Sequence, residues 1–152
     1  MKKDELRELF NCLIGQWTLE REISSTDMGK GTLTGQCRFQ LLGDDRLLLE
    51  EEGVLTLNGV ESEVSRSYVY ALRGNQLVIL YNDPHRKGDV LHELSFSEED
   101  GVLRSRHCHL CGEDRYSLDF VVSDAGRRIQ MDYEVKGPKK DYRMCSVMVP
   151  KV

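Results

Sequence analysis

Hydrophobic and polar residues alternate with a period of two along most of this chain, and one segment near its start departs from that pattern. There, apolar residues recur at the three- and four-residue spacing of a helix face: Leu6, Leu9, Phe10, Leu13 and Ile14. We predict one short helix here, with Asp4 as its N-cap and Gly15 as its C-terminal cap. Its apolar face has to be covered, so we expect the helix to lie across one end of the remaining structure.

From Trp17 onward the alternation predicts about ten short strands separated by turn residues. The predicted strands cover residues 17–23, 31–42, 46–57, 63–72, 76–82, 90–97, 102–111, 114–123, 128–136 and 141–149. Sequential strands with short turns favour an up-and-down antiparallel meander, and closure into a barrel removes the exposed sheet edges. We therefore predict a single all-β domain over residues 1–152, an up-and-down barrel with one N-terminal helix.

Several polar residues lie on the apolar faces of these predicted strands. They are Arg21, Glu51, Arg66 and His92. Burying a charge is costly unless it is paired, so these residues indicate either mutual ion pairs, such as Arg21 with Glu51, or a cavity that takes a polar ligand. A third interpretation is that these strand faces point to solvent. A barrel of about ten strands has room for such a cavity. Two arginines beside Tyr68 and Tyr70 would suit a carboxylate or phosphate group.

The segment from His107 to Tyr116 predicts a tight hairpin. With Gly112-Glu113 as a two-residue type II′ loop, His109 pairs with Tyr116, and both His107 and His109 face the interior. Two interpretations stay open for these histidines: buried, hydrogen-bonded core residues, or His109 and Tyr116 in contact with a ligand or acting as an acid/base pair. We expect no metal, because nothing nearby completes a tetrahedral set of ligands, although a metal on the segment from His107 to Cys111 stays undecided.

Two loops could reach the mouth of a barrel. In the first, Asp83-Pro84-His85 is typical of a rigid turn, and His85 could alternatively touch the contents of a cavity. The second precedes Tyr142 and carries three lysines, which form either a solvated tip or a rim that attracts an acidic ligand.

The chain also resembles known proteins. Gly15-x-Trp17 after a short helix looks like the start of calycin barrels, the lipocalins and fatty-acid-binding proteins. A larger set of motifs resembles an uncharacterised, mainly bacterial family of calycin-like barrels of unknown function: Gly15-Gln16-Trp17 with Arg21, Gly31-Thr32-Leu33-x-Gly35, Glu51-x-Gly53, Arg66-x-Tyr68-x-Tyr70, Asp83-Pro84-His85, His92-x-Leu94-x-Phe96, His109-x-Cys111-x-x-Asp114-x-Tyr116 and Gly137-Pro138-x-Lys140-Asp141-Tyr142. The resemblance implies a closed antiparallel barrel and supplies no activity.

Composition narrows the function classes. The net charge of −5 argues against binding nucleic acid through bulk charge, and no apolar run is long enough to cross a membrane as a helix. Five cysteines without an export signal favour reduced thiols and a cytoplasmic location. We find no nucleotide-binding or hydrolase motif and expect no cofactor. A homodimer stays open.

Our leading hypothesis is a cytoplasmic barrel that binds a small, partly apolar, anionic molecule in an internal cavity. Its candidate ligand-binding residues are Arg21, Glu51, Arg66, Tyr68, Tyr70, His85, His92, His109, Tyr116 and Tyr142. One alternative is a cofactor-independent isomerase or lyase that uses His and Tyr groups of the same cavity. Another is an interaction module whose barrel is filled by side chains.

Overall fold

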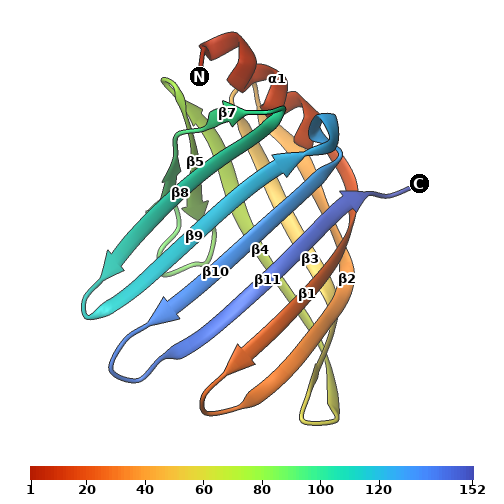
Figure 1. Ribbon diagram of the computed structural model, residues 1–152, viewed down its shortest axis with the longest axis vertical. Coiled ribbons are helices and arrows are strands. Elements are labelled where there is room, and N and C mark those ends of the chain that lie inside the picture. The colour runs from red at the N-terminus through yellow and green to blue at the C-terminus, as the bar shows by residue number, and fades with distance from the viewer.

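The computed structural model describes residues 1–152 as one α-helix, eleven strands and a short 3₁₀ turn, η1 (Figure 1). The elements are α1 (Lys3–Leu13), β1 (Gly15–Ser25), β2 (Gly29–Gly43), β3 (Arg46–Leu57), β4 (Val60–Arg73), β5 (Gln76–Tyr81), β6 (Val90–Leu94), β7 (Ser97–Glu99), β8 (Val102–Cys111), β9 (Asp114–Ser123), η1 (Asp124–Gly126), β10 (Arg128–Lys136) and β11 (Asp141–Pro150). The predicted ranges of β3, β8, β9 and β10 are confirmed to the residue.

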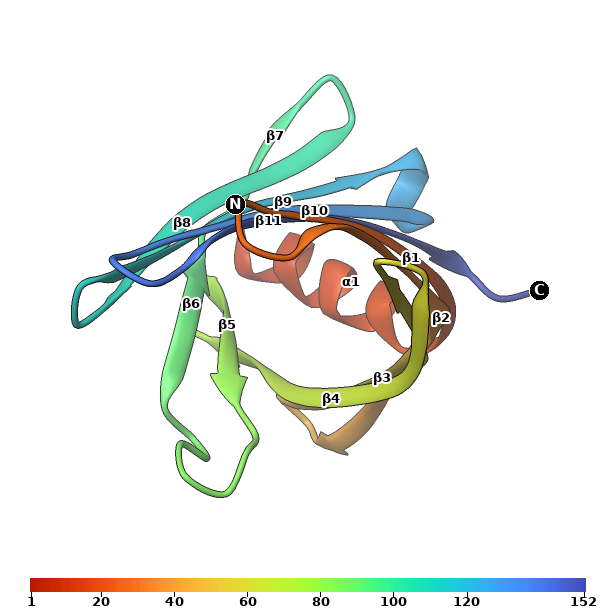
Figure 2. The ribbon, with the colours of Figure 1, turned by 90° about the horizontal axis from the view of Figure 1, so that it is seen from below.

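All eleven strands belong to one antiparallel sheet in the order β6-β5-β4-β3-β2-β1-β11-β10-β9-β8-β7. This order is an up-and-down meander whose first and last long strands, β1 and β11, pair at the centre. The sheet curls strongly, and Figure 2 looks into the curl from one end, with α1 lying across the far end. The predicted antiparallel up-and-down fold is therefore confirmed.

The strand count and the closure differ from the prediction. The predicted strand 90–97 is split at Ser95 and Phe96, because β6 pairs with β5 whereas β7 pairs with the start of β8. The hydrogen-bonded ladder ends at β6 on one side and at β7 on the other, so the backbone does not close the barrel. Strand β6 instead lies beside β8 and meets it through side chains.

Two glycines face each other where β2 and β3 bend. Gly35 pairs with Gly53, and a Cβ atom added to Gly35 would lie 2.0 Å from the carbonyl oxygen of Glu52. Only glycine permits this close approach of two backbones. Nearer the end of β2, a register shift between Leu41 and Gly43 leaves Leu41 exposed, although Leu41 alternates with the buried Cys37 and Phe39.

The main hydrophobic core lies between α1 and the concave face of the sheet. Leu6, Leu9, Phe10 and Leu13 of α1 are buried there, and the indole nitrogen of Trp17 donates a hydrogen bond of 2.9 Å to the Leu13 carbonyl. The helix therefore closes one end of the curled sheet, as its apolar face predicted. No helix of the chain combines the length and apolarity needed to cross a membrane.

The helix caps are not the residues that the sequence predicted. Lys2 is the N-cap and Asp4 lies within the first turn, where its negative charge interacts favourably with the helix dipole instead of capping an N–H group. At the other end Ile14 is the C-cap, and Gly15 already begins β1 with a φ of 131°.

Candidate functional site

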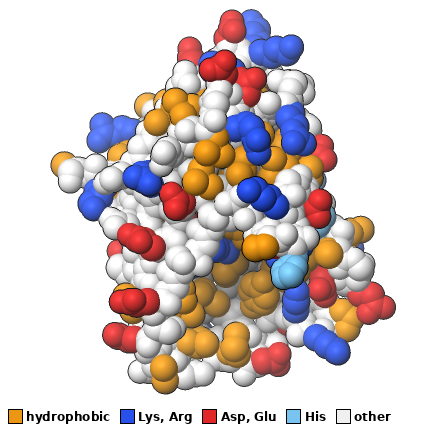
Figure 3. All heavy atoms as spheres, turned by 180° about the vertical axis from the view of Figure 1, so that it is seen from behind, with side chains coloured by type: hydrophobic (Ala, Val, Ile, Leu, Met, Phe, Trp, Pro, Cys, Tyr) orange, Lys and Arg blue, Asp and Glu red, His pale blue; other side chains and the backbone are white.

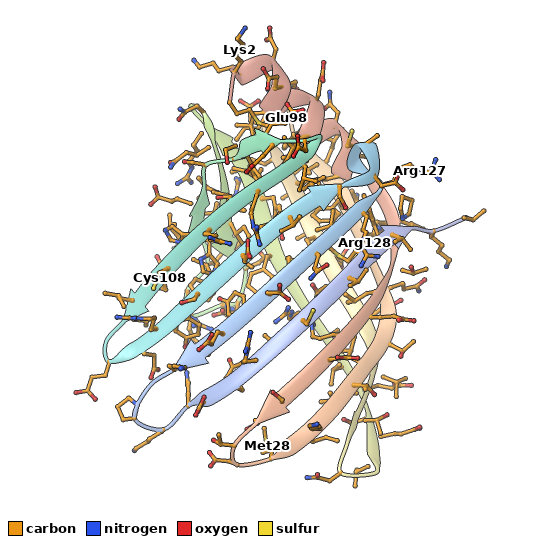
Figure 4. The ribbon with its side chains drawn as sticks, in the orientation of Figure 1. Lys2, Met28, Glu98, Cys108, Arg127 and Arg128 are labelled. Atoms are coloured by element: carbon orange, nitrogen blue, oxygen red, sulfur yellow. The ribbon has the colours of Figure 1, made fainter.

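A cavity of about 250 Å³ lies inside the curled sheet, and none of its lining residues belongs to α1. Lys2, just before α1, and Met28, in the β1–β2 turn, mark the two ends of the molecule in Figure 4. The cavity is lined by eight of the ten predicted ligand-binding residues: Arg21, Glu51, Arg66, Tyr68, Tyr70, His92, Tyr116 and Tyr142. A space-filling view from behind shows a hollow with hydrophobic walls and Lys or Arg side chains around and within it (Figure 3).

Three charged side chains form one wall of this cavity. Both terminal nitrogens of Arg21 donate hydrogen bonds of 3.1 Å to Glu51 Oε1, and its Nε donates one of 2.7 Å to the Ser146 hydroxyl. From the other side, Arg66 Nε donates a hydrogen bond of 2.7 Å to the same Glu51 oxygen. Arg21 and Glu51 are 4% and 5% exposed, whereas Arg66 is 39% exposed.

The Arg21–Glu51–Arg66 group is stabilised internally and keeps one excess positive charge. Burial by itself would raise the pKa of Glu51, but the charges of Arg66 and Arg21 outweigh burial and hold that pKa below its usual range. Glu51 is therefore ionised, and two guanidinium groups share one carboxylate. Arg66 uses only its Nε within the protein, so its two terminal nitrogens keep free donors at the cavity wall.

All six tyrosines of the chain line the cavity: Tyr68, Tyr70, Tyr81, Tyr116, Tyr133 and Tyr142. The rings of Tyr68 and Tyr81 lie 6.5 Å apart between centroids, and those of Tyr116 and Tyr133 lie 6.4 Å apart. The guanidinium carbon of Arg66 lies 5.3 Å from the ring centroid of Tyr68. These contacts hold aromatic faces and a cation in fixed positions around the space.

Two further cations stand at the mouth of the cavity, each on a loop. Arg86, in the loop between β5 and β6, lies 4.0 Å over the ring of Tyr81 and pairs with Asp83. Lys140, in the loop between β10 and β11, donates a hydrogen bond of 2.9 Å to the Tyr116 hydroxyl and pairs with Asp114. The mouth therefore carries two cations, each paired with a neighbouring aspartate.

A chain of three hydrogen-bonding groups leads from the cavity to the seam between β6 and β8. His92 is fully buried; its Nε2 lies 2.8 Å from the Tyr133 hydroxyl and its Nδ1 lies 2.8 Å from Nδ1 of His107. Burial and the neighbouring His107 and His109 lower the pKa of His92 to about 3. Burial also lowers the pKa of His107, which is half-buried.

A neutral imidazole has one N–H, so His92 donates at one of its two contacts and accepts at the other. In one arrangement Tyr133 donates its hydroxyl proton to His92 and accepts from the cavity. In the other, His92 donates to Tyr133, whose hydroxyl proton is then directed elsewhere. The geometry allows both arrangements.

Two predicted site residues do not line the cavity. His85 is exposed on the β5–β6 loop, where Asp83 accepts hydrogen bonds from the backbone N–H groups of His85 and Arg86 and so holds the predicted rigid turn. His109 pairs with Tyr116 in the predicted register, and the centroids of the two rings lie 6.0 Å apart. The His109 side chain nevertheless does not line the cavity. His107, His109 and Cys111 do not converge as metal ligands.

The candidate residues chosen from the sequence also left out side chains that do line the cavity: Tyr81, Arg86, Tyr133, Lys140 and Ser146. The two loops that carry Arg86 and Lys140 were nevertheless expected to reach the mouth. Alternation places Tyr81 with Leu77 and Ile79, and Tyr133 with Met131, so the period of two could have found both tyrosines. Arg86 and Lys140 lie in loops, where no period applies. The pairing of Glu51 with Arg66 also had a local signal, because Asn58-Gly59 is the strongest two-residue hairpin signal and sets this register.

Comparisons with known proteins agree with the fold and leave the activity unassigned. The profile of a family of unknown function, DUF6314, matches residues 13–149. No curated protein matches the sequence significantly. The narrower prediction of a lipocalin or fatty-acid-binding-protein relative, of mainly bacterial occurrence, stays a prediction.

Two solved structures share the architecture at low sequence identity. The S-type phycobiliprotein lyase CPES from Guillardia theta is 10% identical, with a TM-score of 0.65 over 100% of this chain and 99% of the lyase chain. Rv2717c from M. tuberculosis is 11% identical, with a TM-score of 0.67 over 94% of this chain and 95% of that one. At these identities the likeness shows the fold alone.

Proposed function

The chain belongs to DUF6314, a family of unknown function, and from the chemistry of its cavity we propose that this protein binds a small, partly apolar, anionic molecule there. The observation that carries the proposal is the Arg21–Glu51–Arg66 group, whose excess positive charge lies on the wall of an internal cavity. An anion that contacts the terminal nitrogens of Arg66 would balance this charge through charge-assisted hydrogen bonds.

The rest of the lining supports a ligand with an apolar body. Leu49, Ile79, Leu91 and Leu118 contribute aliphatic walls between the tyrosines. The lining therefore combines aliphatic side chains with charged groups and tyrosine hydroxyls, which suits a ligand with an apolar body and polar edges. A barrel filled by side chains, one of the alternatives from the sequence, would leave no such space. We also propose a cytoplasmic location, which the five free cysteines support.

The test is to remove the free guanidinium and leave the fold intact. Arg66→Gln keeps Glu51 paired with Arg21, so we expect a folded protein that binds organic anions about tenfold or more weakly. Native mass spectrometry of gently purified protein would reveal a retained acidic ligand, and a thermal-shift screen of organic acids would supply affinities.

Arg38→Gln is the matched control, since Arg38 is exposed and pairs with Glu50 outside the cavity. Equal anion affinity in Arg66→Gln and Arg38→Gln would contradict the proposed charge role.

A second candidate function is favoured by the hydrogen-bonded chain Tyr133–His92–His107: a cofactor-independent enzyme that moves a proton on its ligand. A proton taken up from the ligand by the Tyr133 oxygen would release the hydroxyl proton to His92 Nε2. His92 Nδ1 would then pass its own proton to His107, which discharges to water from its other nitrogen. This route differs from the predicted His109–Tyr116 acid/base pair, since His109 does not line the cavity.

Isotope exchange distinguishes an enzyme from a binding protein. In D₂O, small carbonyl acids would exchange their α-protons faster in the presence of the protein, and Tyr133→Phe would slow the exchange by roughly a hundredfold. A rate unchanged by Tyr133→Phe, or equal to the protein-free rate, would leave ligand binding as the function.

A further inference from the structure

The cavity walls also narrow the chemical class of the ligand, and this inference rests on the proposed binding function. We propose that the cavity takes a planar aromatic monocarboxylate of one or two rings, whose carboxylate lies on Arg66 and whose ring lies among the tyrosines.

The concentration of tyrosine is the first observation. All six tyrosines of the 152-residue chain lie among the 19 residues that line this one cavity. Flat, rigid aromatic faces pack best against another flat ring, in offset or edge-to-face arrangements, and gain more from it than from an aliphatic group of equal area. The tyrosines come from β4, β5, β9, β10 and β11, so they surround the space instead of forming one wall.

The free hydroxyl groups are the second observation. The hydroxyls of Tyr68, Tyr81 and Tyr142 make no hydrogen bond within the protein, whereas Tyr116 and Tyr133 are bonded to Lys140 and His92. A fully apolar ligand such as an alkyl chain would bury these three hydroxyls without partners, at a cost for each one. A planar ring with polar groups on its edge can pack its faces against the tyrosine rings and form hydrogen bonds with the tyrosine hydroxyls at its edge.

The charge count selects a monoanion. The wall has one excess positive charge, because Arg21 and Arg66 share Glu51. At the mouth, Arg86 is paired with Asp83 and Lys140 with Asp114, so these cations are already balanced. A carboxylate supplies one negative charge, whereas a phosphate monoester brings about −1.5 to −2 at neutral pH and would leave charge uncompensated.

The volume limits the size. About 250 Å³ lies below the roughly 300–1,000 Å³ typical of sites for drug-sized ligands. A long acyl chain or a large polycyclic pigment would have to extend through the mouth between the β5–β6 and β10–β11 loops. A ligand with one or two rings fits within the walls and reaches Arg66.

Four matched probes test the class by isothermal titration calorimetry on the full chain. We expect benzoate to bind. Cyclohexanecarboxylate has the same charge but a puckered ring, and it should bind roughly two- to tenfold more weakly than benzoate. Benzamide has the same ring but no charge, and it should bind more weakly than benzoate by about tenfold or more. Isophthalate, with a second carboxylate, is expected to bind more weakly than benzoate.

Variants of Tyr142 separate its ring from its hydroxyl. Tyr142 is half-buried and makes no hydrogen bond, so both substitutions should fold, which circular dichroism would verify. Tyr142→Leu should bring the benzoate-to-cyclohexanecarboxylate ratio close to one, and Tyr142→Phe should keep it. Tyr68→Leu provides the same comparison on the opposite wall if Tyr142→Leu fails to fold.

The outcomes distinguish this inference from the function on which it rests. If cyclohexanecarboxylate binds as tightly as benzoate, or if Tyr142→Phe loses the preference as fully as Tyr142→Leu, the aromatic class is overturned and anion binding stands. If isophthalate binds tighter than benzoate, the monoanion is overturned. If benzamide equals benzoate and Arg66→Gln changes nothing, anion binding itself fails, and the inference fails with it.

Discussion

Glu51 is the residue on which the charge of the cavity depends. It is 5% exposed, and two arginines donate hydrogen bonds to its carboxylate. A buried carboxylate in this position is stabilised only by its partners, and each partner is stabilised by it. Its role in the proposed site is that of a counterion for Arg21, leaving Arg66 to the ligand. The sequence hypothesis had placed Glu51 itself against the ligand, and that role stays untested.

Replacing Glu51 by Gln should therefore lower stability and raise anion affinity at the same time. Two guanidinium groups would remain without a counterion, and breaking a buried pair costs about 3–5 kcal/mol. Urea denaturation would measure the loss. The matched control is Glu50→Gln, whose carboxylate is exposed beside Arg38 and should matter by less than about 1 kcal/mol. Equal stability of the two variants would contradict the buried ion-pair assignment.

At the scale of elements, the seam between β6 and β8 is the place where the sheet does not close. The backbones of the two strands form no ladder, and His92 of β6 meets His107 of β8 and Tyr133 of β10 instead. This contact needs His92 to be neutral, because a charged imidazolium donates from both nitrogens and would face the neighbouring histidines in a buried position.

The seam predicts a definite dependence of stability on pH. His92 has an ordinary pKa near 6.5 when unfolded and a pKa of about 3 when folded, so the unfolded chain binds a proton that the folded chain excludes. The free energy of unfolding should therefore fall as the pH drops below 6.5, by about 1.4 kcal/mol per pH unit.

Urea denaturation between about pH 6.5 and 5 measures this effect, since ordinary carboxylates stay mostly ionised there. His107, whose pKa burial also lowers, contributes in the same direction, so His92→Gln should reduce the slope without abolishing it. A slope that is the same in both proteins would mean that His92 does not carry the pH dependence.

At the scale of the whole molecule, the two ends of the curled sheet have different roles. Helix α1 covers one end with buried leucines and Phe10, whereas the cavity is lined by strand residues and by Arg86 and Lys140 of two loops. None of the residues lining the cavity belongs to α1. The helix that covers one end of the sheet therefore contributes no side chain to the cavity wall.

This separation predicts that Phe10→Ala destabilises the protein and leaves binding intact. Phe10 is almost fully buried, and its truncation should cost about 3–5 kcal/mol in urea denaturation. Benzoate affinity, measured well below the melting temperature, should change by less than about twofold, because additivity holds for distant sites. Exposed Ile14→Ala serves as the control. A large loss of affinity in Phe10→Ala would show that the two ends are coupled.

The sequence by itself determined most of the strand ranges, most of their inward faces and the register of the β8–β9 hairpin. The alternation of side chains and the turn residues are local properties, so the ranges of β8 and β9 and the pairing of His109 with Tyr116 followed from them. The positions of Arg21 and Glu51 on buried faces followed in the same way.

Only the tertiary structure decided which of these groups meet. His92, His107 and Tyr133 come from β6, β8 and β10, which are not neighbours in the ladder, and they touch because the sheet curls. Arg86 and Lys140 reach the mouth through loops whose course no period describes. The curvature of the sheet depends on many contacts between strands that are distant in the sequence, and the local alternation of side chains does not specify those contacts.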